Sequence, residues 1–109
     1  MRNTIITQSF WTPQGTIHVV GKLGTSPIIS LTQGLNSAEL HSAAACALNF
    51  LNCGFFEVKI STAACSEYEQ EGVRDLEKIL NKEFKGDVLI DVQPGVYLIT
   101  KKVDDKPGD

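Results

Sequence analysis

The sequence predicts an α/β domain with the element order βββαβαββ, and three features of the chain carry this prediction. Residues 3–32 are rich in Thr, Ile, Val and aromatic side chains broken by Pro- and Gly-containing segments, which is typical of a strand meander. Residues 37–52 change to an Ala- and Leu-rich helical pattern. Strand-like and helical segments alternate after that, which favours crossover connections in a mixed sheet.

Three strands are expected before the first helix, over residues 3–11, 16–23 and 28–32. The segments between them, 12–15 and 24–27, contain Pro and Gly at positions that suit tight turns. Tight turns join neighbouring strands that run in opposite directions, so we expect these three strands to be antiparallel.

The first helix is expected over residues 37–52, with Asn36 as its N-cap and Gly54 as a left-handed residue after its end. Its apolar surface is wide, and its alanines would let it lie close to a sheet. A second helix opens at the capping-box sequence of residues 66–69 and ends at residues 85–86.

The remaining strands are expected over residues 55–62, 88–92 and 96–101. All elements then belong to a single domain, residues 1–102, followed by a polar tail, residues 103–109.

The bulk properties narrow the class of protein. No apolar run has the roughly 18 residues of a membrane span, and the N-terminus lacks a signal-peptide pattern, so we expect a cytoplasmic location without membrane contact. Three cysteines without a CxxC motif favour reduced thiols, and small buried residues are the expectation for Cys46 and Cys53. A net charge of −3 does not favour nucleic-acid binding, so such a role needs a local basic patch.

Several segments resemble the ribonuclease H-like superfamily, most clearly between Asn36 and Val73. Residues 36–48 resemble the family's first helix, an Asn followed by x-x-E-L-x-A-A and then Ala-Leu. Residues 57–62 resemble the next strand, which ends Ser-Thr-Asp in the family, and residues 68–73 resemble a Tyr-x-x-x-Gly-Ile pattern after a two-residue insertion. The resemblance implies one mixed sheet, with the first, fourth and fifth strands parallel neighbours and the second and third antiparallel at one side.

The family cleaves the RNA strand of an RNA–DNA hybrid with two metal ions held by clustered carboxylates. The resemblance places Gln8 at the first-strand Asp position, and Ala63, or Cys65 if the insertion falls earlier, at the fourth-strand one. Only Glu39 keeps a carboxylate, and one carboxylate cannot hold two magnesium ions. A degenerate domain without a metal cofactor is therefore expected, and magnesium or manganese enters only if the domain is active.

Glu39 also has a purely structural interpretation. It lies three residues after Asn36, the position at which a glutamate completes a capping box. Helix capping therefore explains Glu39 without a metal.

A basic stripe on the second helix is the candidate contact for nucleic acid or an acidic protein. The stripe consists of Arg74, Lys78, Lys82 and Lys85, spaced at i, i+4, i+8 and i+11. Helical geometry places these residues on one face, opposite the expected core face. A solvated surface is the simpler interpretation of the same stripe.

Three functions remain open on the sequence alone. The first is a catalytically inactive binding module, with nucleic acid as the candidate partner. The second is a metal-dependent nuclease whose site is rebuilt from Glu39, Glu57 or Asp91 and completed by a second subunit. The third is a protein-interaction module, including a homodimer through the Ala-rich helix or the edge of the final strand.

Overall fold

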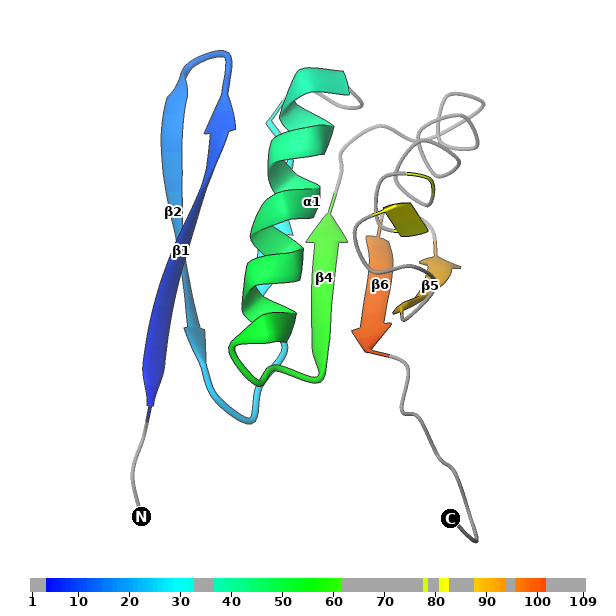
Figure 1. The fold of residues 1–109 in the computed structure, drawn as a ribbon. Coiled ribbons are helices and arrows are strands. Elements are labelled where there is room, and N and C mark those ends of the chain that lie inside the picture. The colour runs from blue at the N-terminus through cyan, green and yellow to red at the C-terminus, as the bar shows by residue number, and fades with distance from the viewer. Residues whose placement is uncertain are drawn as a thin grey trace, which may run out of the picture.

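The fold belongs to the α/β class, as the sequence predicts, and the strands in the described part of the chain form two separate sheets (Figure 1). It is seen in a computed structural model that describes residues 4–32, 37–61, 78, 81–82, 88–93 and 96–101. The described elements are β1 (Ile5–Thr12), β2 (Gly15–Lys22), β3 (Ile28–Ser30), α1 (Ser37–Asn52), β4 (Glu57–Ser61), β5 (Val88–Gln93) and β6 (Val96–Lys101).

β1 and β2 form an antiparallel hairpin by themselves. Their register runs from Ile5 opposite Lys22 to Thr12 opposite Gly15. The Thr12 hydroxyl closes the two-residue turn, because it donates to the Gly15 carbonyl at 2.7 Å and accepts from the Gln14 amide at 3.2 Å. This hairpin confirms the antiparallel pairing expected for the first two strands.

The second sheet has the strand order β3-β4-β6-β5. β3 runs parallel to β4, which is the pairing a helical crossover such as α1 allows. β6 is antiparallel to both of its neighbours, β4 and β5.

The strand pairing differs from the single mixed sheet that the sequence predicts. β3 does not continue the meander, because it leaves β2 and joins β4, where the fully buried Ile29 lies opposite the fully buried Ile60. In the described part of the chain, β1 pairs with β2 and not with β4 or β5. β6 lies inside its sheet, so the expectation that the final strand offers a free edge is wrong.

Helix α1 lies between the two sheets, with the hairpin on one side and β4 on the other (Figure 1). Its exposed residues follow one narrow helical stripe, and nearly all the others are buried. The stripe consists of Ala38, His41, Ala45, Asn49 and Asn52. The wide Ala-rich surface is therefore covered within the chain, which contradicts its use as a dimer contact.

The end of α1 follows the local signals in the sequence. Gly54 has a φ of 108°, a left-handed conformation that glycine adopts without a steric penalty. The Phe55 amide then donates back to the Phe50 carbonyl at 3.2 Å, and the two rings meet edge to face at 5.1 Å.

The hairpin approaches this end of α1 closely at Gly21. A Cβ there would lie 2.9 Å from Cγ of Pro27, 3.0 Å from Cζ of Phe55 and 3.1 Å from Cε1 of Phe50. A side chain at this position would therefore force the neighbouring rings to shift.

The second helix lies mainly, and the tail of residues 103–109 wholly, outside the described residues. Lys78, Asn81 and Lys82 are described, and all three are helical and exposed. No helix within the described ranges is long and apolar enough to cross a membrane.

Candidate functional site

Glu39 is completely buried in the first turn of α1. Its carboxylate accepts hydrogen bonds from the Thr32 amide at 2.6 Å and from the Thr32 hydroxyl at 3.0 and 3.1 Å. These contacts tie the chain after β3 to the start of α1. Asn36, its expected capping partner, lies outside the described residues.

Gln8 lies at the opposite end of α1 from Glu39. Its side chain faces the helix from β1, and its Nε2 donates to Sγ of Cys53 at 3.6 Å. Cys53 comes fourteen residues after Glu39, and that length of helix spans about 21 Å. The structure does not bring together the two positions that a two-metal site of the ribonuclease H type would need side by side.

The other candidate carboxylates do not join Glu39. Glu57 and Asp91 lie on the face of the four-stranded sheet that points away from α1, because the alternating residues Val58 and Ile60 are buried beneath the helix. Asp91 accepts a long hydrogen bond, 3.4 Å, from the Gln93 amide group. Over the described ranges, no three His, Cys, Asp or Glu side chains gather as a metal site.

Of the remaining predicted site residues, Lys78 and Lys82 are helical, exposed and one turn apart. Ala63, Cys65, Arg74 and Lys85 lie outside the described residues.

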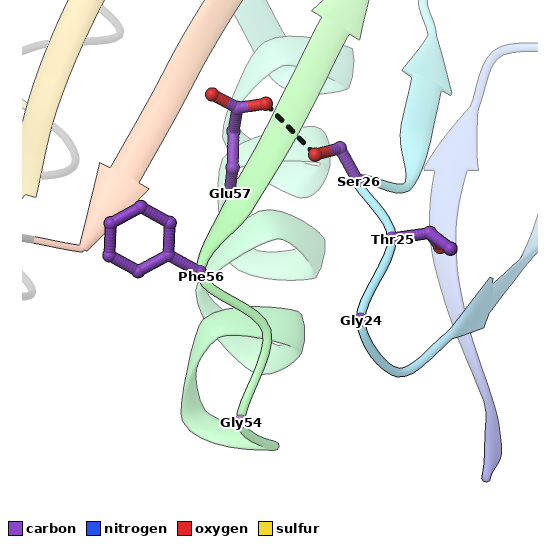
Figure 2. A pocket seen from close by; sticks show the side chains of 6 residues that line it. All are labelled: Gly24, Thr25, Ser26, Gly54, Phe56 and Glu57. Atoms are coloured by element: carbon purple, nitrogen blue, oxygen red, sulfur yellow. Dashed lines mark hydrogen bonds between the residues drawn. The ribbon is translucent and has the colours of Figure 1, made fainter. Parts of the chain in front are cut away.

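A hollow of about 240 Å³ opens where the loop before β3 meets the start of β4 (Figure 2). It is lined by Gly24, Thr25, Ser26, Gly54, Phe56 and Glu57. Glu57 accepts a hydrogen bond from the Ser26 hydroxyl at 2.8 Å, while the Thr25 hydroxyl donates to the Lys22 carbonyl at 2.6 Å. The hollow thus offers one carboxylate, and a neighbouring hydroxyl already satisfies one of its oxygens.

The two described cysteines have different environments. Cys46 is buried in α1, and desolvation raises the pKa of its thiol from 9.0 to about 11. A thiol with such a pKa is a poor nucleophile near neutral pH. Cys53 is exposed, which corrects the expectation that it packs in the core.

The outer face of the hairpin is the surface that sequence analysis missed. Every outward-facing side chain of both strands is exposed, and these are Ile5, Thr7, Ser9, Trp11, Thr16, His18, Val20 and Lys22. Three of them are large and apolar, with exposed fractions of 62% for Ile5, 47% for Trp11 and 64% for Val20. The alternation of these apolar residues along the two strands is visible in the sequence. The sequence does not show which face of the hairpin α1 covers.

Comparison of the chain with known protein families, with curated proteins and with solved structures finds no match. Any functional assignment therefore depends on the geometry of the molecule itself.

Proposed function

We propose that this chain is a non-catalytic protein-interaction domain that binds its partner on the outer face of the β1–β2 hairpin. The observation that carries the proposal is the exposure of all eight outward side chains of that face, three of them large and apolar. On the surface of a soluble protein, large apolar side chains that gather on one face mark a site of contact with another molecule.

The arrangement on this face suits a protein partner. Ile5 and Val20 are diagonal neighbours across the strand pair, at one end of the face. Trp11 lies at the other end, opposite Thr16, and tryptophan is enriched among residues that dominate binding energy. Hydroxyl groups of Thr7 and Ser9 lie between these ends and offer hydrogen bonds to a partner.

The separation of Gln8 from Glu39 along α1 supports the non-catalytic part of the proposal. Glu39 is also committed to Thr32, so its burial has a structural explanation. The resemblance of residues 36–73 to the ribonuclease H-like superfamily stays a prediction, and the proposal does not depend on it.

A nucleic-acid-binding module is the second candidate, favoured by one observation. Lys78 and Lys82 are both exposed on a helical segment, four residues apart, as the basic stripe requires. The overall charge of −3 opposes this candidate, because phosphate contacts dominate affinity for nucleic acid.

A peptide-selection experiment tests the proposed surface. A displayed peptide library is selected on the folded chain, with counter-selection on the double variant Trp11→Ser, Val20→Thr. We expect peptides that bind the original chain, lose binding to the double variant and shift the emission of Trp11, the single tryptophan, to shorter wavelength. Leu89→Thr is the matched control, because Leu89 is similarly exposed but lies on β5.

Two results would replace the proposal. If the selected peptides bind the double variant as tightly as the original chain, the hairpin face is not the binding surface. Cleavage of an RNA–DNA hybrid with magnesium or manganese, abolished by Glu39→Gln, would show a metal-dependent nuclease.

A further inference from the structure

The direction of the main-chain groups in the hairpin can be derived from two contacts. In an antiparallel pair, alternate residues direct both N–H and C=O toward the partner strand, and the others direct both away. The Leu23 amide donates to the Thr4 carbonyl across the hairpin, whereas the Trp11 amide donates away from β2, to the Ser42 hydroxyl on α1 at 2.5 Å. Even-numbered residues of β1 therefore bond to odd-numbered residues of β2.

This alternation turns half of the main-chain groups of β2 toward the edge that lies away from β1. The even-numbered residues of β2, opposite Ile5, Thr7, Ser9 and Trp11, direct their main-chain groups away from β1. The Lys22 carbonyl is taken by Thr25. Within the described residues, the N–H and C=O groups of Thr16, His18 and Val20 make no hydrogen bond.

Within the described residues, each of the other strand edges carries a feature that natural proteins commonly use to limit edge pairing. The Ser42 hydroxyl occupies the edge of β1 at Trp11. β3 is only three residues long, and β5 carries the exposed carboxylate of Asp91. The segment 16–20 of β2 has none of these devices, since it contains no proline, no Asp, Glu, Lys or Arg, and no covering hydroxyl. The one charged residue of β2, Lys22, lies at the end of the strand.

We propose that the chain pairs with a second copy of itself through this edge, the two β2 strands running antiparallel about a two-fold axis at His18. In this register Thr16 lies opposite Val20 of the second copy, and His18 lies opposite His18 of the second copy. Each opposed pair exchanges two N–H···O hydrogen bonds, because all three residues direct both groups outward.

The second copy is the occupant that this edge fits best. The edge is self-complementary, so one two-fold contact uses both free edges and closes the assembly. Thr16 and Val20 are β-branched, and such cross-strand pairs stabilise a sheet. Two hairpins become one four-stranded sheet, a size at which a sheet is more stable than an isolated hairpin.

This contact goes beyond the proposed function. It uses the main-chain groups of Thr16, His18 and Val20 at the edge of β2, whereas the peptide partner would use the side chains of the outer face. The peptide selection and the measurement of self-association can therefore fail independently.

Sedimentation equilibrium of the whole chain over a wide range of concentrations tests the contact. We expect the average mass to rise from 11.9 kDa toward twice that value. The variants H18K and H18E should each weaken self-association about tenfold or more, because two like charges then face each other across the axis. An equimolar mixture of the two variants should restore the dimer, because opposite charges then meet.

Asn49→Lys and Asn49→Glu are the matched controls, since Asn49 lies on the exposed stripe of α1, and both should dimerise like the original chain. Amide hydrogen exchange supplies a second readout: the Thr16, His18 and Val20 amides should exchange more slowly as concentration rises. A mass that stays at 11.9 kDa at every concentration would overturn the inference. So would a dimer that H18K and H18E leave intact, or a mixture of the two that stays monomeric.

Discussion

The buried carboxylate of Glu39 accepts hydrogen bonds from both the amide and the hydroxyl of Thr32. Glu39 is completely buried, and hydrogen bonds to its carboxylate offset part of the cost of taking that group out of water. The pair thus joins the end of β3 to the start of α1 and positions the helix between the two sheets. Its importance for stability can be measured directly.

Glu39→Gln should destabilise the fold by about 1–3 kcal/mol, because a neutral amide accepts weaker hydrogen bonds than a carboxylate and brings an NH2 group into a fully buried position. Urea denaturation measures the change in the free energy of unfolding. Asp91→Asn is the control, because an exposed carboxylate on β5 should change stability by less than about 0.5 kcal/mol. Equal stability of the two variants would show that the Thr32 contact is dispensable.

Gly21→Ala should destabilise the fold by about 1–3 kcal/mol, since the added Cβ meets the Pro27, Phe50 and Phe55 side chains at 2.9–3.1 Å. Thermal unfolding followed by circular dichroism checks this. Ser9→Ala, which adds no atom and lies on the exposed face of β1, should unfold like the original chain. An unchanged midpoint for Gly21→Ala would mean that the rings move aside without cost.

Cys46 should react slowly with an alkylating reagent at neutral pH, and Cys53 should react quickly. Burial protects the Cys46 sulfur and raises the pKa of its thiol to about 11, while Cys53 is exposed. Mass spectrometry of labelled peptides distinguishes the sites. Rapid labelling of Cys46 under conditions that keep the fold intact would contradict this prediction.

The same thiol predicts a loss of stability in alkali. The folded pKa of Cys46 lies above its unfolded value, so its contribution is complete below about pH 9 and is lost as pH rises toward 11. Within that window the slope is at most about 1.4 kcal/mol per pH unit. Cys46→Ala should remove this part of the dependence, as denaturation at pH 8 and near pH 10.5 would show. An unchanged slope in the variant would assign the alkaline loss to other groups.

Reversal of two charges distinguishes the two binding functions. Lys78→Glu with Lys82→Glu should leave stability within about 0.5 kcal/mol, because both side chains are exposed. A protein-interaction domain should show no affinity for hybrid, duplex or single-stranded nucleic acid in gel shifts at low salt. Binding that weakens in the double variant and falls less steeply with salt would instead favour the nucleic-acid candidate.

Short-range signals in the sequence account for the local elements that the structure describes. α1 covers residues 37–52 as predicted, because Gly54 ends it by a backbone preference that needs no distant contact. The first hairpin follows from its turn in the same way, and β6 matches its expected range. The spacing of apolar residues, the helix caps and the turn residues each act over a few neighbouring positions. They can therefore be recognised in a single amino-acid sequence.

Tertiary structure alone decided which strands pair and which candidate residues meet. β3 joins β4 because burial of Ile29 beside Ile60 under α1 depends on the whole core, and a three-residue strand carries no signal of its partner. The same packing places Gln8 at one end of the helix and Glu39 at the other, although a linear motif treats them as parts of one site. Among the described residues, β2 likewise has a hydrogen-bonded strand on one side only, because α1 lies against β1, and side-chain alternation in the sequence does not reveal this arrangement.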